Sequence, residues 1–180
     1  MRKLKMDELG RMSVEEFKDT SKTSIAIVLD DVRSALNVGS AFRTADAFAC
    51  AEMILCGFTA QPPHREILKT ALGSTDSVAW RHFQETDAAI ALLKAEGYTI
   101  IAIEQAENPV YLEEIEDKIK PHAAGKYALI FGNEVEGVSE NAMKNADFVV
   151  EIPQFGTKHS LNIAVTVGIV SWEFVKILRK

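Results

Sequence analysis

SIAIVLDDVRSALNVGSAFRTA, at residues 24–45, begins as an apolar strand sequence and opens into polar residues that lead into a helix. Its first residues are mostly apolar and branched, and the run is short, which favours a strand over a helix. The arrangement recurs twice: YALIF at 127–131 precedes FGNEVEGVSE at 131–140, and FVVEI at 148–152 precedes IPQFGTKHSLNIAV at 152–165. Because α/β proteins build their sites where strands end in such residues, these three polar segments predict where the function lies.

Strand-like and helix-like patterns alternate along the chain, which is typical of parallel α/β architecture. The sequence therefore predicts an α/β fold with a mostly parallel sheet flanked by helices. Expected strands cover residues 24–29, 52–56, 78–83, 98–103, 127–131 and 148–152, and expected helices cover 11–19, 38–49, 65–71, 87–95, 139–145 and 161–178, with a short acidic helix in the connector 104–126.

Length and composition allow one domain. The chain has 180 residues, of which 47% are hydrophobic, enough for one sizeable core. We expect residues 1–22 to form a short N-terminal arm and residues 23–180 to form a single domain. No run approaches the roughly 18 apolar residues of a membrane span, and the N-terminus lacks a signal-peptide pattern. These features predict a cytoplasmic protein without a membrane partner.

Cysteine and histidine residues form no metal or disulfide pattern. Cys50 and Cys56 are too few for a disulfide framework, and we interpret them as small apolar residues around a core strand. The histidines, which show no ligand spacing, are His64, His82, His122 and His159. The sequence thus predicts no metal cofactor.

The net charge of −6 argues against a protein that grips nucleic acid over its whole surface. Phosphate contacts need lysine and arginine residues, so an RNA footprint would have to be a local basic face. Basic residues lie near both ends, at Arg2, Lys3, Lys5, Lys176, Arg179 and Lys180, and between them at Arg33, Arg43, Arg65, Lys69 and Arg81.

The last expected helix, at 161–178, has an apolar face with three-and-four spacing. The simplest interpretation is that this face covers the sheet, and a contact between two copies is the alternative. Its members are Leu161, Ala164, Val165, Gly168, Ile169, Trp172 and Val175.

Familiar phosphate-binding motifs are missing from the polar segments. No G-x-G-x-x-G follows the first strand, and GNEVEG at 132–137 lacks the Gly-Lys-Ser/Thr ending of a P-loop. A nucleotide-binding α/β protein that does not act on RNA is therefore disfavoured. The segments instead suit the holding of a polar substrate. Arg43 can fork onto a phosphate or carboxylate, Glu134 can accept a hydrogen bond, and Ser160 or Asn162 can cap the last helix or reach a ligand.

Taken together, the three segments closely resemble the signature motifs of the SpoU-type (TrmH-like) RNA ribose 2'-O-methyltransferases of the SPOUT superfamily. Asn37-Val-Gly39 with Arg43-Thr-Ala45 matches the first motif, and Phe131-Gly132-Asn-Glu134 with Gly137 matches the second. Ile152-Pro153 through Gly156, followed by Ser160-Leu161-Asn162, matches the third. The departures are mild, with Val138 where leucine is usual and Gln154 where methionine is common.

The resemblance implies a SPOUT fold whose C-terminal segment threads into a deep trefoil knot, with S-adenosylmethionine bent into the knot loops. Family members are homodimers with active sites at the interface. Residues carried over as binding the methyl donor are Ile103, Gly132, Ile152, Ser160 and Leu161.

The resemblance also implies roles in catalysis. Arg43 is the family's presumed catalytic residue. Some accounts make this arginine the general base, but a guanidinium stays protonated, so we favour a phosphate clamp and electrostatic aid. Asn37, Glu134, Ser160 and Asn162 would complete the catalytic set by orienting the ribose and Arg43. Expected RNA contacts are Arg33, Arg43, Arg65 and Arg81.

The resemblance leaves the RNA open. Small family members commonly act on tRNA, which is our first expectation, with ribosomal RNA second. Within tRNA, we place a guanosine of the D-loop ahead of the wobble nucleotide of the anticodon. A protein that keeps the fold and binds RNA and the donor without turnover is an alternative of another class.

Overall fold

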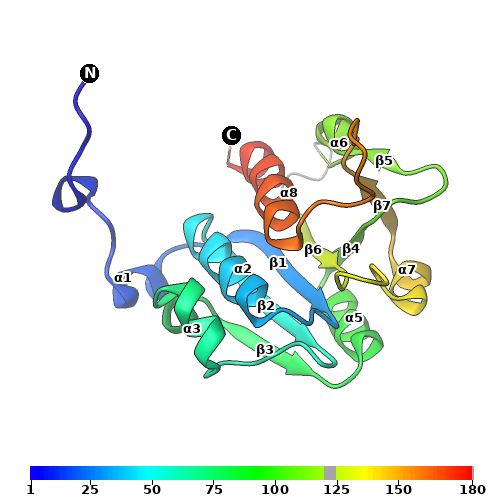
Figure 1. Cartoon of the computed structure of the whole chain (residues 1–180), viewed down its shortest axis with the longest axis horizontal. Helices are drawn as coiled ribbons and strands as arrows, with labels where there is room; N and C mark the ends of the chain where they lie inside the picture. The colour runs from blue at the N-terminus through cyan, green and yellow to red at the C-terminus, as the bar shows by residue number, and fades with distance from the viewer. Residues whose placement is uncertain (120–124, 180) are drawn as a thin grey trace.

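A computed structural model describes residues 1–119 and 125–179 of the chain (Figure 1). His122 and Lys180, named above, lie outside these residues. In the described part, seven strands form one sheet in the order β3-β2-β1-β6-β4-β7-β5, and every neighbouring pair is parallel. The strands are β1 (Thr23–Asp30), β2 (Cys50–Cys56), β3 (Trp80–Phe83), β4 (Tyr98–Ile103), β5 (Val110–Tyr111), β6 (Lys126–Phe131) and β7 (Phe148–Glu151).

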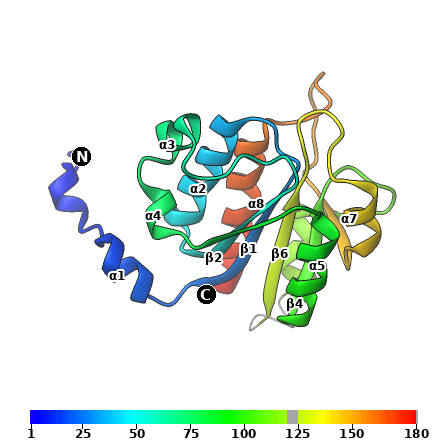
Figure 2. The ribbon, with the colours of Figure 1, turned by 90° about the horizontal axis from the view of Figure 1, so that it is seen from below.

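Helices cover both faces of the sheet, as Figure 2 shows from a second direction, and the predicted α/β fold is confirmed. Alternate residues of β1 serve the two cores: Ile25 and Ile27 belong to one, and Ala26 and Val28 to the other. The first core is covered by α2 (Ala35–Ala47), α3 (Arg65–Ala71), η2 (Leu112–Glu114), α6 (Ile115–Ile119) and α8 (Ile163–Leu178), and the second by α5 (Thr86–Ala95) and α7 (Glu140–Asn145). The short helix α4 (Ser74–Ser77) packs against α2.

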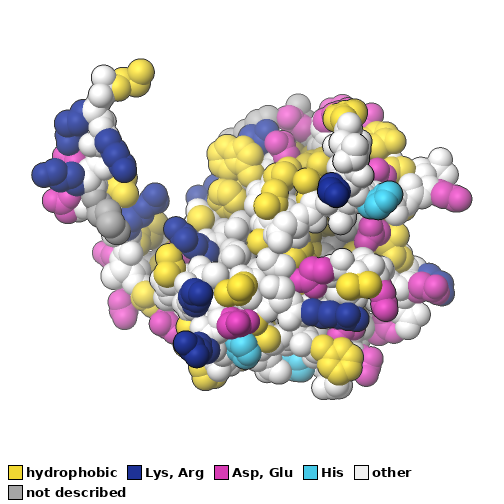
Figure 3. Space-filling view, viewed as in Figure 1, with side chains coloured by type: hydrophobic (Ala, Val, Ile, Leu, Met, Phe, Trp, Pro, Cys, Tyr) yellow, Lys and Arg dark blue, Asp and Glu magenta, His cyan; other side chains and the backbone are white. Residues whose placement is uncertain are grey.

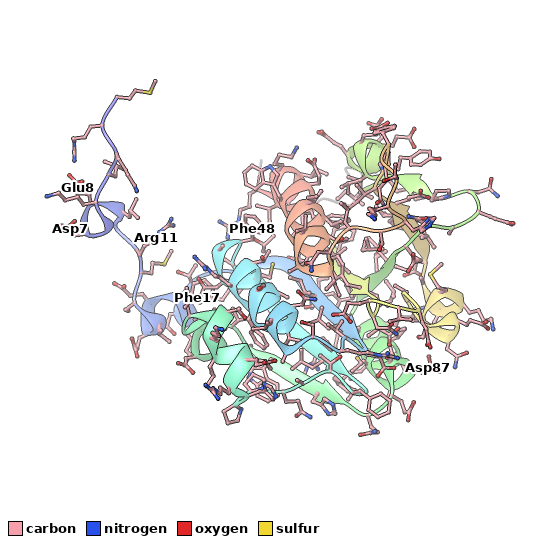
Figure 4. All side chains as sticks on the ribbon, viewed as in Figure 1. Asp7, Glu8, Arg11, Phe17, Phe48 and Asp87 are labelled. Carbon is pink, nitrogen blue, oxygen red and sulfur yellow. The ribbon has the colours of Figure 1, made fainter. Side chains whose placement is uncertain are left out.

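The N-terminal residues extend away from the body (Figures 1 and 4). They contain η1 (Met6–Leu9) and α1 (Val14–Asp19). Phe17 of α1 is buried in the first core, and the Lys22 ammonium lies 4.0 Å from the centre of its ring. The segment thus packs on the body through Phe17 and through the contact of α1 with α4.

The apolar face predicted for the last helix is mainly its exposed face. Leu161 is 39% exposed, Val165 50%, Ile169 38% and Trp172 50%. The interpretation that this face covers the sheet is therefore wrong. The sheet is covered by the other side of α8, through Ile163, Val167, Val170, Phe174 and Ile177.

Helices α2 and α3 pack so closely that no side chain fits between them at Gly39. A Cβ atom added there would lie 2.1 Å from Thr70 Oγ1 and 2.3 Å from the Ile67 carbonyl oxygen. The Thr70 hydroxyl donates a hydrogen bond of 2.9 Å to the Leu36 carbonyl and joins the two helices. Gly39 of the first polar segment therefore fixes the position of α3 beside α2.

We expect Gly39→Ala to lower the free energy of unfolding by about 1–3 kcal/mol, because the new methyl group must displace the backbone of α3. Urea unfolding would measure this change. The matched control is Gly156→Ala in the exposed loop after β7, where an added Cβ meets no atom within 4 Å and φ lies outside the left-handed region. Alanine there should raise the free energy of unfolding by about 0.4–1 kcal/mol, because it restricts the unfolded chain. Equal effects of the two substitutions would contradict the packing role of Gly39.

Within the described ranges, no helix combines the length and the hydropathy needed to cross a membrane.

Candidate functional site

The three polar segments meet at the carboxyl ends of β1, β6 and β7, as the sequence predicts. The Asn162 amide donates a 3.3 Å hydrogen bond to Asn37 Oδ1. The Asn37 amide in turn donates a 2.9 Å hydrogen bond to Glu134 Oε1. One chain of side-chain hydrogen bonds therefore links residues that are 97 and 125 positions apart in the sequence.

Glu134 organises the start of α2. Its carboxylate accepts hydrogen bonds from the backbone NH groups of Arg33, at 3.1 Å, and Ser34, at 3.2 Å, besides the one from Asn37. Burial alone would raise the pKa of Glu134, but the hydrogen bonds from Asn37 and from the backbone together lower that pKa below its usual value. A carboxylate held ionised by three donors is a poor proton acceptor, so Glu134 positions its neighbours rather than acting as a base.

Asn162 is the N-cap of α8. Its Oδ1 accepts a 2.9 Å hydrogen bond from the Ala164 backbone NH, while its amide group points to Asn37. The capping interaction fixes the side chain, which leaves the amide in one orientation. Of the two caps that the sequence offered, the structure uses Asn162 and leaves Ser160 on the wall of a cavity.

The loop after β6 is closed by its own backbone. Asn133 and Gly137 exchange two hydrogen bonds, of 3.0 and 3.1 Å. A Cβ atom at Gly132 would lie 1.9 Å from the carbonyl carbon of Gly137, and Gly137 has a φ of +71°. The closed loop therefore requires glycine at both positions.

Glu104 is a site residue that the sequence did not reveal. Its carboxylate accepts a 3.0 Å hydrogen bond from the backbone NH of Val138 and thereby ties the end of β4 to the loop after β6. The available signal was its position: a charged residue directly after the buried strand 98–103.

A cavity of about 510 Å³ lies between the loops that follow β4, β6 and β7. Among the described residues, its charged lining is almost entirely acidic. Its lining includes four carboxylate residues, Glu104, Glu134, Glu136 and Glu151. Of the described lining residues, His159 alone has a side chain of the basic type. The predicted donor-binding residues all line this cavity: Ile103, Gly132, Ile152, Ser160 and Leu161.

Arg43 does not line this cavity. It projects from α2 into a second cavity, of about 530 Å³, that lies between α2, α3 and α8. Its side chain is exposed, and it makes no ion pair with any residue in 1–119 or 125–179. Both cavities reach the first turns of α8, the first at residues 161–163 and Thr166 and the second at Gly168.

The other arginines predicted to contact RNA are dispersed. Arg33 and Arg65 are exposed, at the loop before α2 and at the start of α3. Arg81 forms ion pairs with Glu52, at 2.7 Å, and Glu96, at 2.8 Å, and these two partners raise the pKa of its guanidinium. Figure 3 shows lysine and arginine side chains gathered over α3 and hydrophobic side chains over α8. RNA contact by these arginines stays a prediction, and Arg81 is the one already engaged by protein carboxylates.

Both cysteines are buried core residues. Burial raises the pKa of Cys50 and of Cys56 to about 12, so both are protonated thiols at neutral pH. In the part of the chain that the structure describes, no group of His, Cys, Asp or Glu residues is arranged to hold a metal ion.

Comparison with known proteins identifies relatives across nearly the whole chain. A family model described as the SpoU rRNA Methylase family matches residues 24–172. A tRNA/rRNA methyltransferase of Borreliella burgdorferi, itself described as uncharacterized, is 30% identical over 160 residues, which cover 89% of this chain and 67% of that protein. A tRNA (guanosine(18)-2'-O)-methyltransferase of Thermus thermophilus is 30% identical over 166 residues, covering 92% of this chain and 81% of that protein.

A solved structure of a similar protein has the same fold as this chain. The AdoMet-bound rRNA methyltransferase of Sinorhizobium meliloti superposes with a TM-score of 0.78 at 28% identity and covers 90% of this chain. The match spans 60% of that protein's length.

Proposed function

This chain belongs to the SpoU rRNA methylase family, and we propose that it transfers the methyl group of S-adenosylmethionine to the 2'-hydroxyl of a ribose in RNA. The observation that carries the proposal is the hydrogen-bonded chain Asn162–Asn37–Glu134 at the edge of the acidic cavity. It joins the three motif segments at one place.

The cavity residues fit the methyl donor by charge and by shape. S-adenosylmethionine carries a sulfonium, an ammonium and a carboxylate group, with a net positive charge, and the two faces of its adenine ring are flat and apolar. Carboxylates such as Glu104 and Glu151 complement the positive charges, while Ile103, Ile152 and Leu161 offer apolar surface to the adenine. When bound, the donor supplies an electrophilic methyl carbon.

The protein's part in the reaction is positioning and electrostatics. Glu134 fixes Asn37, and Asn37 with Asn162 presents amide groups that orient the ribose at the mouth of the cavity. Arg43 binds a phosphate beside that ribose and stabilises the negative charge that develops on the 2'-oxygen. The proton of the hydroxyl passes to a phosphate oxygen of the RNA or to water, because Glu134 is already occupied by three donors.

We infer that two copies associate through the exposed apolar face of α8. Leu161, Val165, Ile169 and Trp172 leave one side of this helix uncovered, which is typical of an interaction surface. The cavity that contains Arg43 borders the same helix. A second copy that covers the apolar face of α8 would therefore also lie beside Arg43.

Ile169→Glu is expected to weaken this dimer at least about 100-fold, because a two-fold axis brings the new carboxylates of the two copies together. Light scattering after size-exclusion chromatography would measure the mass at several concentrations. Leu92→Glu is the matched control, since Leu92 on α5 is equally exposed, at 38%, but lies on the other side of the sheet. A dimer that survives Ile169→Glu, or one that only Leu92→Glu disrupts, would rule out the α8 interface.

A knotted C-terminal segment remains part of the proposal. It is supported by the path of the chain: β7 lies beside β4, whereas α8 returns to contact β1 and α2 in the first-core layer. The loop at 152–162 must cross the carboxyl edge of the sheet to make this connection.

For the substrate, we propose tRNA first and ribosomal RNA second. Relatives carry both names: tRNA (guanosine(18)-2'-O)-methyltransferase in Thermus thermophilus and 23S rRNA (guanosine-2'-O-)-methyltransferase in Pseudomonas putida, the latter 24% identical. We place a D-loop guanosine ahead of the wobble ribose.

The decisive experiment is transfer of tritiated methyl groups to undermethylated total tRNA and rRNA, followed by mapping of the modified ribose. Incorporation at a 2'-oxygen is the expected result. Binding of S-adenosylmethionine without incorporation into either pool would favour the protein that binds RNA and donor without turnover. Absence of donor binding in calorimetry would overturn the proposed function as a whole.

A further inference from the structure

The second cavity contains two unpaired cations, of which the motifs explain only one. Arg43 reaches it from α2 and Lys69 from α3. Both side chains are exposed, and neither forms an ion pair within residues 1–119 and 125–179. In a protein with a net charge of −6, two cations on one cavity without a carboxylate partner indicate an anion site.

The packing of α2 on α3 places these cations together. Gly39 lets the backbone of α3 approach α2, and the Thr70 hydroxyl bonds the Leu36 carbonyl across the contact. Thr70 directly follows Lys69, so the lysine is held at the rim that Arg43 also lines. The Thr44 hydroxyl opens on the same cavity and can donate to an anion.

Charge separates the two cavities. The donor cavity is lined by four glutamates, which would repel a phosphate, whereas the charged side chains of the second cavity are Arg43 and Lys69. The cavities are neighbours along α8, the first bordering residues 161–163 and Thr166 and the second Gly168. A single nucleotide can therefore present its ribose to the first and its phosphate to the second.

We propose that Arg43 and Lys69 together bind one backbone phosphate of the RNA, adjacent to the ribose that is methylated, and that Lys69 is an RNA-binding residue of this protein. The proposal rests on the proposed function, since it names how that same substrate is held. Arg65 lies one helical turn before Lys69 on the exposed side of α3. It extends the basic surface in the direction of a neighbouring RNA phosphate.

Salt dependence of RNA binding tests the proposal directly. The slope of log Kobs against log salt concentration counts phosphate contacts, and losing one contact lowers its magnitude by about 1. We would measure tRNA binding by fluorescence anisotropy from about 50 to about 200 mM salt. Lys69→Ala is expected to reduce the slope by about 1 and to weaken binding, with Lys69→Arg restoring both. Affinity for S-adenosylmethionine should not change.

The matched control is Lys94→Ala. Lys94 lies on α5, on the opposite face of the sheet, and pairs with Asp147 at 3.9 Å, so its loss should leave the slope unchanged. The double variant Arg43→Ala/Lys69→Ala should weaken binding by less than the product of the two single effects, because both residues serve one phosphate. If the loss of affinity in the double variant equalled the product of the two single losses, the two residues would not share one phosphate.

If Lys69→Ala bound tRNA with the same salt slope as the unsubstituted protein, Lys69 would not contact a phosphate and the inference would be overturned. The proposed methyl-transfer function would not be affected by that result. A protein that binds S-adenosylmethionine but no RNA at any salt concentration would overturn both together. RNA binding by the unsubstituted protein therefore tells the two failures apart.

Discussion

Arg43→Ala is expected to lower the single-turnover rate of methyl transfer by about 10²–10³-fold at saturating RNA, while S-adenosylmethionine binds with unchanged affinity. Loss of one preorganised group that stabilises developing charge typically costs this much. The donor should still bind, because Arg43 projects into the cavity between α2, α3 and α8 and not into the acidic one. Rapid-quench measurement of methyl incorporation would give the rate, and calorimetry the donor affinity.

Arg43→Lys separates the charge from the shape of the guanidinium. Lysine keeps the positive charge but loses the planar fork that binds a phosphate with two hydrogen bonds. We expect this variant to bind RNA better than Arg43→Ala and still to react at least about tenfold more slowly than the unsubstituted protein. Near-normal turnover by Arg43→Lys would remove any special role of the guanidinium. Arg11→Ala, at an exposed position of the N-terminal segment (Figure 4), is the control for general loss of positive charge.

The central strands and the gathering of the site followed from the sequence. Runs such as Ser24–Leu29 are short and branched, and buried strands of a parallel sheet need such residues on both faces. Parallel strands end at one edge, which is why residues as distant as Asn37 and Asn162 could be expected to meet. In the structure their amide groups form a hydrogen bond with each other.

Other features could not be predicted because they depend on tertiary contacts. The two residues of β5, Val110–Tyr111, are too few to show a period, and their pairing with β7 defines them as a strand. Both sides of α8 are apolar, so the period alone does not say which side covers the sheet. The ion pairs of Arg81 with Glu52 and Glu96 join residues that are 29 and 15 positions apart, so no local pattern predicts them.

Separation of Arg43 from the donor cavity is the most informative difference for mechanism. Motif spacing places Asn37 and Arg43 six residues apart on α2, which suggests one compact catalytic set. In the structure, Asn37 contacts Glu134 at the first cavity, and Arg43 faces the second. In the proposed mechanism the set therefore divides into residues that organise the ribose and donor and residues that hold the phosphate.

Glu134→Gln should disturb the residues that organise the ribose and leave the residues that hold the phosphate unchanged. The carboxylate accepts the Arg33 NH on Oε2 and the Ser34 NH and Asn37 amide on Oε1. Glutamine keeps the size but turns one acceptor into a donor, so either the Arg33 NH or the Ser34 NH and Asn37 amide lose their acceptor. In both cases the start of α2, which carries Asn37, must shift. A displacement of about 1 Å at a positioning residue can cost about 10²-fold in rate, which is the expected loss of single-turnover transfer. The salt slope of RNA binding should stay unchanged, because no phosphate contact is removed.

Stability against pH gives an independent readout of the same substitution. Hydrogen bonds hold the pKa of Glu134 below its usual value in the folded protein, so ionised Glu134 stabilises the fold above the unfolded pKa of about 4.3. That stabilisation is lost as the pH falls through the folded pKa. Urea unfolding should therefore separate the unsubstituted protein from Glu134→Gln most at pH values near neutrality and least in acid. Glu107→Gln, at an exposed loop carboxylate, should show neither the rate loss nor the pH dependence, and if it behaved like Glu134→Gln the organising role of Glu134 would be refuted.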